Sequence, residues 1–473
     1  MNSSLALGLY IAGIAGLLYL DRDKSVRASK ALWLPVIWLS IAGSRSVSAW
    51  LGMGPGRGTA GQVPPTSMLD QVLAASLMLL GTIVLVRRGR VVGGVLKAIW
   101  PVVLYFSFCL VSLLGSDFAE WGFKRWVRAL GDLIMVLIVA TDAQPIEAFR
   151  RLFSRIGFVL LPASVLLIKY YPGLGQGFDD FGYREYTGVT TSKNVLGNLV
   201  FVIVLAALWQ ALSLVRNRRA PNRTRRLLAQ CALIAIGIDL LSIAHCATAV
   251  GCCVLGVGLM LATSLPLIRY RPAAVHALVF TLLLSGGLIT LLGGRAAVTE
   301  ALGRKPDLTG RTVIWEIVIP MAPNPISGAG FETFWLGSRV ERIFALVGGP
   351  QMTNEAHNGY IETYLNLGCL GLCLIALILG QGYRRTVSAF RRDSALGALL
   401  VTYVVTAAAF NISEAGFRML SLEWFVLLLS IVVASRVTDV ANSPSHSPRR
   451  LAEPGFAAGA NWHPLLEMIG QQR

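Results

Sequence analysis

The segment VLGNLVFVIVLAALWQALSLV, Val195–Val215, is long enough to cross a lipid bilayer and carries no charged side chain. Similar apolar runs recur along the whole chain, in which hydrophobic residues make up 55% and charged residues 14%. These runs are Ser4–Leu20, Met68–Val86, Val91–Leu114, Leu227–Ala244, Val250–Leu267, Ala274–Leu292, Gly359–Gly380, Ala395–Phe410 and Leu420–Ala434. The composition excludes a soluble enzyme and predicts a membrane protein with many spans.

Three weaker apolar runs, Ala31–Met53, Ala129–Thr141 and Gly157–Tyr171, raise the number of predicted spans to about 12 or 13. The fold class is therefore predicted as an all-α polytopic integral membrane protein. A large loop is expected between the helices near 274–292 and 359–380. An odd number of spans puts the N-terminus outside and an even number puts it inside, so the sequence leaves that side open.

The formal net charge of +17 comes mainly from basic clusters that occupy every second connection between the apolar runs. The clusters are DRDKSVRASK, RRGR, the Arg150–Arg155 segment, RNRRAPNRTRR, RYR and the pairs Arg384-Arg385 and Arg391-Arg392. By the positive-inside rule these connections are cytoplasmic and the others face outward. No nucleic-acid partner is expected, because the basic residues lie in short loops without an aromatic-rich binding module.

The chain is predicted to form one transmembrane domain, residues 1–437, followed by a disordered cytoplasmic tail, residues 438–473, rich in Pro, Ser, Gly and Ala. Two outward loops, 172–193 and 293–357, are expected to form the active site. The second is far longer than usual connections between bundled helices, which indicates an ordered, functional loop. Within it, LTGRTVIWEIVI predicts a short amphipathic helix that lies on the membrane and is ended by Pro320.

Cationic side chains in these outward loops suit a phosphate-bearing lipid head group, because guanidinium groups bind phosphate oxygens bidentately. Arg311 lies in the first turn of the predicted helix, where free backbone N–H groups can address the same anion. Arg184 lies among tyrosines that can stack on a sugar. An ordinary interfacial side chain is the alternative for each arginine taken alone.

His357 precedes the apolar run that starts at Gly359. On a helical wheel, His357, Tyr364, Gly368 and Gly371 form one stripe, whose glycines would admit another helix or a lipid tail. The positive end of the helix dipole disfavours imidazolium, so a neutral His357 is expected to serve as a general base. The alternative is a histidine that only satisfies a loop carbonyl. No metal site and no cofactor are expected, because no ligand motif is present.

His357-Asn358, nine residues and then Gly368-x-x-Gly371 reproduce the H[NSQ]x9GxxG pattern of a known family. The chain thereby resembles the O-antigen ligase and polymerase superfamily of bacterial envelope glycosyltransferases. Four segments resemble its exopolysaccharide-polymerase-like branch: SDFAEWGFKRWVRALG, TGVTTSKNVLGN, GRKPDLTGRTVIW and GAGFETFW. In the turn SIAHCAT, where the family commonly has Arg or Lys, this chain has His245, so the role of that position stays open.

The resemblance implies a metal-independent reaction on the periplasmic side of the bacterial inner membrane, with a donor glycan carried on undecaprenyl pyrophosphate. It implies that Arg184 and Arg311 contact the pyrophosphate or glycan and that His357 is the catalytic base. The other predicted substrate contacts are Lys193, Asn194, Arg304, Trp315, Asn358, Tyr364, Gly368 and Gly371.

These inferences predict an inner-membrane polysaccharide polymerase that transfers a lipid-pyrophosphate-linked glycan onto a hydroxyl of another lipid-linked repeat unit, in exopolysaccharide or O-antigen synthesis. An O-antigen ligase that moves the finished glycan to lipid A-core or another acceptor is the first alternative. A non-enzymatic transporter of lipid-linked sugars is the second, although intramembrane charges are few. Expected partners are the lipid-linked oligosaccharide, the bilayer, and a flippase and a chain-length regulator of the pathway.

Overall fold

The computed structural model describes residues 2–23, 28–53, 67–178, 182–265, 268, 271, 273–281, 311–347 and 355–442. In the first half of the chain its helices are α1 (Ser3–Leu20), α2 (Trp33–Ala42), α3 (Val47–Trp50), α4 (Met68–Arg87), α5 (Gly89–Ala98), α6 (Trp100–Val111), α7 (Ala119–Ala140), α8 (Pro145–Tyr170), α9 (Pro172–Gly175) and α10 (Lys193–Arg216). In the second half they are α11 (Arg223–Ala244), α12 (Ala247–Ser264), α16 (Arg311–Val318), α17 (Ser338–Val347), α18 (Gly359–Arg392), α19 (Ser394–Phe410) and α20 (Leu422–Asn442). Short 3-10 helices cover Lys30–Leu32, Ser112–Gly115 and Ile319–Met321. In these residues the only sheet is a hairpin of β1 (Gln176–Phe178) and β2 (Arg184–Tyr186), with Gly177 opposite Glu185.

Seven helices of the described residues are long and apolar enough to cross a bilayer, or eight if the bent α5–α6 pair is one span. The seven are α1, α4, α8, α10, α11, α12 and α18. The predicted all-α polytopic class is confirmed. The number of spans by this criterion is below the predicted 12 or 13 because α2 and α19 are shorter helices, because α7 and α20 are not among the helices that meet it, and because Ala274–Leu292 lies partly outside the described residues.

The predicted single span Val91–Leu114 is in fact two helices that meet at an angle of 86°. Ile99 leaves helical geometry (φ −100°, ψ 32°), and Pro101 follows without a backbone N–H to continue the hydrogen-bond ladder. The apolar pattern alone does not show this bend, since both halves are hydrophobic.

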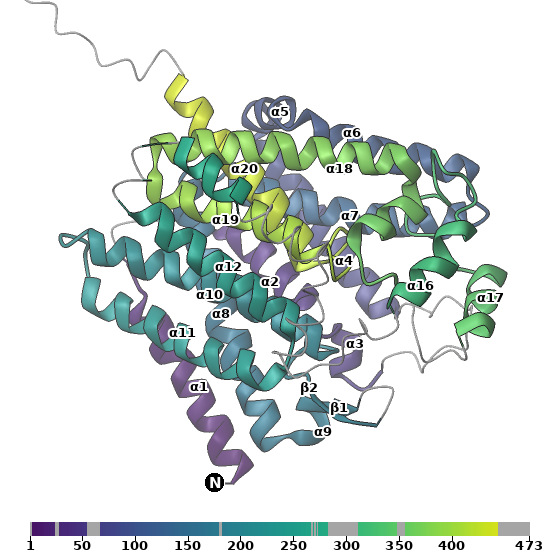
Figure 1. Ribbon diagram of the computed structural model, residues 1–473. Coiled ribbons are helices and arrows are strands. Elements are labelled where there is room, and N and C mark those ends of the chain that lie inside the picture. Colours follow the sequence, from purple (N-terminus) through teal and green to yellow (C-terminus); the bar gives the residue numbers. More distant parts are fainter. Residues whose placement is uncertain are drawn as a thin grey trace, which may run out of the picture.

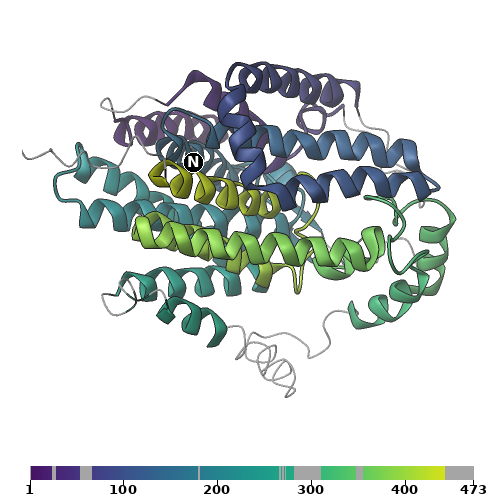
Figure 2. The ribbon, with the colours of Figure 1, turned by 90° about the horizontal axis from the view of Figure 1, so that it is seen from above.

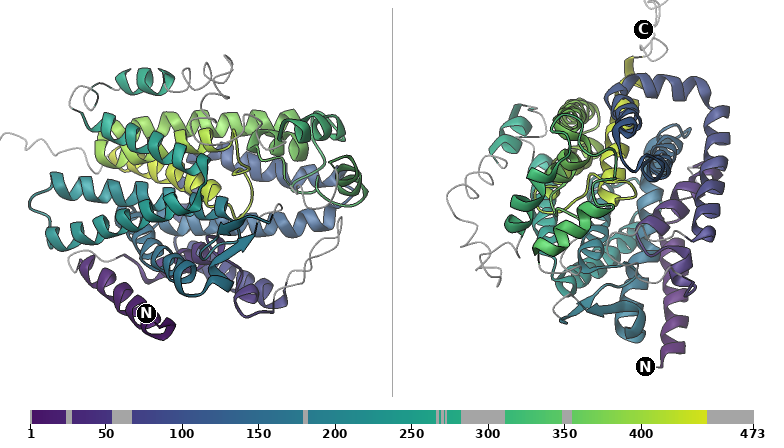
Figure 3. Two further views of the ribbon diagram at one scale, coloured as in Figure 1. Left: turned by 60° about the horizontal axis from the view of Figure 1, so that its bottom comes forward. Right: turned by 90° about the vertical axis from the view of Figure 1, so that its right-hand side faces the viewer.

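The centre of the bundle is α10, which is apolar around most of its circumference and contacts α8, α11, α12 and α19. The hydroxyl of Tyr403 on α19 donates to the Val202 carbonyl of α10 at 2.8 Å. Next to this core, α18 lies alongside α20 and α6 (Figure 2). By contrast, α1 lies at the periphery (Figure 3) and exposes apolar side chains such as Leu9 and Ile11, as a lipid-facing helix does.

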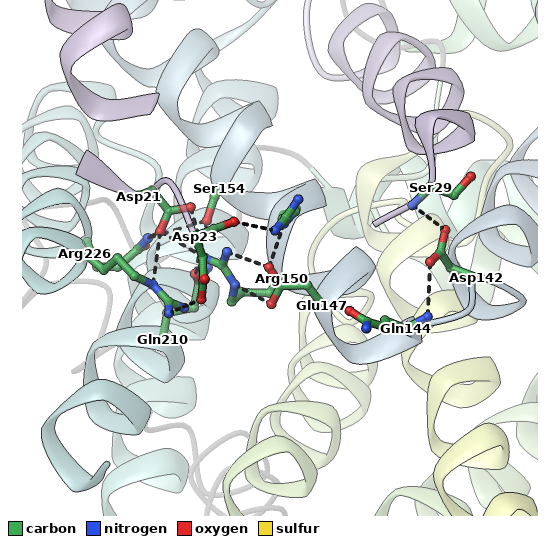
Figure 4. A network of polar contacts seen from close by, with 12 residues as sticks. Asp21, Asp23, Ser29, Asp142, Gln144, Glu147, Arg150, Ser154, Gln210 and Arg226 are labelled. Carbon is green, nitrogen blue, oxygen red and sulfur yellow. Dashed lines mark hydrogen bonds and ion pairs between the residues drawn. The ribbon is translucent and has the colours of Figure 1, made fainter. Parts of the chain in front are cut away.

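A buried network of ion pairs ties the end of α1 to α8 and α11 (Figure 4). Asp21 is 2.9 Å from Nη1 of Arg150, whose Nη2 lies 2.8 Å from Glu147, and Asp23 is 3.0 Å from Nη1 of Arg226. Part of the positive charge predicted for the cytoplasmic loops is therefore neutralised inside the protein. Removing one partner would leave an uncompensated buried charge.

The predicted outward and cytoplasmic connections separate in space. Figure 1 shows α16 and α17 at one end of the bundle and the basic turn between α10 and α11 at the other. This placement agrees with the alternation of loops that the positive-inside rule predicts. Of the predicted tail, residues 443–473 lie outside the described residues, and α20 continues to Asn442, past the predicted boundary at 437.

Candidate active site

The outward loop is attached to α18 where that helix is interrupted. Gly368 adopts non-helical angles (φ 63°, ψ −162°), which frees backbone groups for hydrogen bonds with the loop. The N–H groups of Cys369 and Leu370 donate to the carbonyls of Pro325 and Ile326 at 2.8 and 3.1 Å. In the other direction, loop residues Ala329 and Gly330 donate to the carbonyls of Leu365 and Asn366 at 3.0 and 2.9 Å. The loop thus pairs with the helix as a strand would.

Of the two glycines of the sequence pattern, Gly368 serves this docking. A Cβ at Gly368 would lie 2.2 Å from the carbonyl carbon of Ile326, and a Cβ at Gly371 would lie 2.3 Å from the Cβ of Leu367. The prediction that these glycines admit another helix or a lipid tail is wrong, because loop backbone and the neighbouring turn of α18 fill that space. Gly368 lies against the loop, whereas Gly371 packs against Leu367 and Thr363 of its own helix, and their contact with substrate stays a prediction.

Replacing Gly368 with alanine is expected to lower thermal stability in detergent, by roughly 1–3 kcal/mol for the left-handed backbone alone and more for the clash. The matched control is Gly380→Ala on the same helix, where an added Cβ meets no atom within 4 Å. Melting temperatures followed by fluorescence would test this. Equal melting temperatures for the two variants would refute the docking role of Gly368.

The predicted amphipathic helix is present as α16, and Ile319–Met321 ends it as a 3-10 turn at the predicted proline. Much of the apolar face that was predicted to lie on the membrane packs inside the protein, while Ile319 stays exposed. Ile314 and Val318 are buried against Phe334 and Leu365, because the docked loop brings α18 under this face.

The two aromatic residues predicted as substrate contacts, Trp315 and Tyr364, pack against this same cluster. The indole N–H of Trp315 donates to the carbonyl of Ala356 at 2.7 Å. That bond positions the residue directly before His357. The structure therefore gives Trp315 a supporting contact beside the site.

His357 itself lies outside α18, which starts at Gly359, and has a left-handed backbone (φ 47°). The predicted stripe on one continuous helix is therefore wrong, since the wheel assumes helical geometry from His357 to Gly371. Asn358, predicted as a substrate contact, caps α18. Its Oδ1 accepts from the N–H groups of Tyr360 and Ile361, and its amide donates to the Ile412 carbonyl.

The segment Asn411–Arg418 between α19 and α20 is fastened to the start of α18. The N–H of Gly359 donates to the carbonyls of Asn411 and Glu414 at 2.8 and 3.0 Å. Asn411 Oδ1 accepts from the N–H groups of Gly416 and Phe417, which closes the segment on itself. This arrangement brings the Glu414 side chain against His357.

Two carboxylates contact His357, and each of them binds a guanidinium group. Its Nδ1 lies 3.1 Å from Glu355 and 3.6 Å from Glu414, as charge contacts rather than aligned hydrogen bonds. Arg311 binds Glu414 at 3.1 Å and also donates to the carbonyl of Ser413. Arg418 binds Glu355 at 2.7 Å. We call these five side chains, His357, Glu355, Glu414, Arg311 and Arg418, the imidazole–carboxylate cluster.

The cluster corrects the expectation of a neutral histidine. Burial alone would lower the pKa of His357, but the Glu355 and Glu414 carboxylates outweigh burial and raise that pKa to about 9. Burial would conversely raise the pKa of Glu355, yet His357 and Arg418 lower it to about 2. The Glu355 and Glu414 carboxylates thus favour the protonated form of His357 more than the helix dipole disfavours it. The expected effect of the helix dipole took no account of Glu355 and Glu414.

Glu355, His357 and Glu414 offer three ligand atoms within 4.8 Å of one another, close enough for one metal ion. Each carboxylate already binds a guanidinium group, and His357 would have to lose its proton. A metal would therefore compete with Arg311, Arg418 and a proton for the same three side chains.

The other predicted site residues divide into two groups. Asn194 joins the cluster, with its amide donating to both Glu414 oxygens at 3.4 Å. Lys193 instead pairs with Glu185 at 2.5 Å, and Arg184 is exposed on β2. Arg304 lies outside the described residues.

Sequence reasoning missed Glu355, Glu414 and Arg418. The signal available for Glu414 and Arg418 was the pair of opposite charges in the short outward segment NISEAGFR. His245, the position that departs from the family, ends α11 in a left-handed conformation and is exposed.

Two comparisons with known proteins give similarities in sequence. A family profile described as "O-Antigen ligase" matches residues 231–376, a range that includes Arg311 and His357. The chain is 24% identical over 316 residues to the "Exopolysaccharide production protein ExoQ" of Rhizobium meliloti (strain 1021), which covers 63% of this chain and 67% of the relative. Together with the multi-pass helical fold, these matches support the resemblance of the chain to the O-antigen ligase-like superfamily.

Proposed function

We propose that the protein is an inner-membrane polysaccharide polymerase with its active site on the periplasmic side. It would transfer a glycan from undecaprenyl pyrophosphate onto a hydroxyl group of another lipid-linked repeat unit. The observation that carries the proposal is the imidazole–carboxylate cluster, in which His357 contacts Glu355 and Glu414 while Arg311 and Arg418 balance their charge. The basic connections at the opposite end of the bundle support the periplasmic assignment.

In the proposed reaction, His357 Nε2 takes the proton of the acceptor hydroxyl as its oxygen attacks the anomeric carbon of the donor glycan. The new glycosidic bond forms while the bond from that carbon to the pyrophosphate oxygen breaks, and lipid pyrophosphate leaves. Arg311, and Arg184 from the hairpin, neutralise the leaving group. Among the described residues no hydrogen bond engages Nε2 of His357, which leaves this nitrogen for substrate.

The pH dependence tests the role of His357. A general base works in its deprotonated form, so a pKa of about 9 predicts that kcat/KM rises through the neutral range and levels off above pH 9. Glu355→Gln removes a group that raises this pKa and should move the rise to lower pH. Initial rates in proteoliposomes between about pH 6 and about pH 10, a range that includes this pKa, would measure both profiles. Activity that is constant below pH 9 and falls above it would identify imidazolium as the active form and contradict the base role.

The function itself is tested by reconstitution. Purified protein in liposomes receives a lipid-pyrophosphate-linked oligosaccharide with excess chelator and no nucleotide, and product length is read on a gel. Ladders of repeating units would support a metal-independent polymerase. Ladders that appear only when a divalent metal is supplied would contradict metal independence. They would favour coordination of that metal by Glu355, His357 and Glu414.

An O-antigen ligase is the second candidate function, and the description of the matched family profile favours it. The description of the relative, an exopolysaccharide production protein, favours a polymerase instead. Offering both acceptors in one assay discriminates the two. Transfer of glycan to lipid A-core without ladders would establish the ligase.

A further inference from the structure

We propose that a cavity of about 490 Å³ beside the imidazole–carboxylate cluster receives the polyprenyl pyrophosphate of the acceptor, a second lipid distinct from the donor. The inference rests on the proposed polymerase function, because transfer between two lipid-linked glycans needs two places for a lipid pyrophosphate. The volume falls within the range of sites for small molecules.

The cavity lies between α2, α4 and α7 and is closed by Arg418–Leu420. Its apolar lining consists of Trp38, Ile41, Ala42, Leu73, Ala74, Leu77, Met419 and Leu420, with Trp121 also present. Its charged lining consists of Lys124, Arg125, Arg128 and Arg418 together with Asp70 and Glu332. Cationic side chains thus outnumber acidic ones in an otherwise apolar space, which is the complement of an anionic lipid.

The two kinds of lining are arranged along the helix axes. Asp70 lies in the first turn of α4, and Leu77 follows about 10 Å further along that helix at 1.5 Å per residue. On α7 the cationic residues precede Gly131, where an added Cβ would lie 2.2 Å from the ring of Trp38. The charged lining therefore lies nearer the start of both helices, and the apolar lining lies deeper. A pyrophosphate head and an isoprenoid tail need this order.

Arg128 is the lining cation best placed for a ligand. It is half-buried, and within the described residues its interaction with a carboxylate is an electrostatic one with Asp70 of the same lining, without a direct hydrogen bond. Lys124, by comparison, is paired with Glu120 at 2.5 Å, and Arg125 donates to the Glu332 carbonyl. A guanidinium group in a cavity gains most when an anion with several oxygens binds it.

The wall beside Leu420 is fixed by a buried carboxylate. Asp132 on α7 accepts from the indole N–H of Trp38 at 2.8 Å and from the backbone N–H of Leu420 at 2.9 Å. Leu420 keeps a left-handed backbone (φ 57°), which the surrounding contacts must maintain. The cavity is therefore part of the folded architecture.

One residue joins this cavity to the cluster. Arg418 lines the cavity, lies 3.5 Å from Glu332, and binds Glu355, the carboxylate that contacts His357. An anion in the cavity competes with Glu355 for Arg418. The acceptor lipid would thus be held two contacts away from the proposed base, while Arg311 binds the other carboxylate, Glu414, and does not line the cavity.

The experiment uses the full chain in nanodiscs of zwitterionic lipid, with Arg311→Ala in every protein so that the proposed donor site is weakened. Radiolabelled farnesyl pyrophosphate is the probe, and unlabelled inorganic pyrophosphate is the competitor. Arg128→Gln should weaken farnesyl pyrophosphate binding about tenfold, as the loss of one charge-assisted contact does. Ala74→Trp, which fills the apolar lining, should weaken binding of the prenyl compound but not of inorganic pyrophosphate.

Matched controls are Arg219→Gln, which removes a charge from the exposed turn after α10, and Ala75→Trp, which places the ring on the exposed side of α4. Both should bind the probe as their parent does. Equal binding in all variants would overturn the inference. Displacement of the probe by phosphatidylglycerol added to the nanodiscs would also overturn it, since the cavity would then be a general site for anionic lipids.

The polymerase assay separates this inference from the proposed function. In an otherwise unchanged chain, Arg128→Gln should raise KM for the acceptor about tenfold and leave kcat near the wild-type value. Unchanged KM in an active polymerase would refute the acceptor site. The wild-type protein could also form no polymer and still lose probe binding on Arg128→Gln substitution. That result would refute the polymerase function and the assignment of the bound lipid as the acceptor, while leaving a prenyl pyrophosphate site.

Discussion

Replacing His357 with alanine is expected to lower the rate of glycan polymerisation by roughly 100- to 10,000-fold, the usual contribution of a positioned acid–base side chain. The loss should be catalytic rather than structural, because Arg311 and Arg418 still balance Glu414 and Glu355 when the imidazole is absent. Initial rates of ladder formation in proteoliposomes would measure the effect. His357→Gln should be as inactive, since glutamine has no titratable group.

The matched control is His276→Ala, because that imidazole contacts the Tyr383 hydroxyl at 2.9 Å and takes no part in the cluster. Its activity should equal that of the wild type. If His357→Ala, folded as shown by its melting temperature and elution volume, still polymerised within a few fold of the wild type, His357 would not be catalytic.

Replacing Arg311 with alanine is expected to reduce kcat by roughly 100- to 1,000-fold, the range for removal of one donor that stabilises developing negative charge. A second effect follows from the cluster. Arg311 lowers the pKa of His357, so its loss should raise that pKa further above its ordinary value and move the rise of activity to higher pH. Rates over a pH series, with donor concentration varied at each pH, would separate the two effects.

Arg342→Ala is the matched control, because Arg342 is exposed on α17 in the same outward loop. It should leave kcat and the pH profile unchanged. Arg311→Lys should retain part of the activity, since lysine keeps the charge but not the two-pronged geometry. Equal kcat in Arg311→Ala and Arg342→Ala would show that Arg311 does not act on the leaving group.

Sequence reasoning succeeded where local pattern was sufficient. The apolar runs predicted a polytopic helical protein, and the segment from Arg311 to Pro320 predicted α16 and its end. It failed where a local break changed the geometry. The helical wheel grouped His357 with Tyr364, but His357 lies outside α18 and Gly368 interrupts that helix. A glycine in an apolar run predicts that another group packs closely against it. The sequence alone does not show that at Gly368 this group is the backbone of the loop.

The membrane class and the alternation of loops follow from amino-acid composition and order. Each span must satisfy its backbone hydrogen bonds within itself, and the charge of each short loop decides on which side of the membrane it lies. The protonation of His357 does not follow from the order of residues in the chain. Glu414 is 57 positions away in the chain and reaches Nδ1 only because Gly359 donates to the segment between α19 and α20. Electrostatic effects depend on distance in space, so the raised pKa of His357 and the charged cavity beside Arg418 exist only in the folded protein.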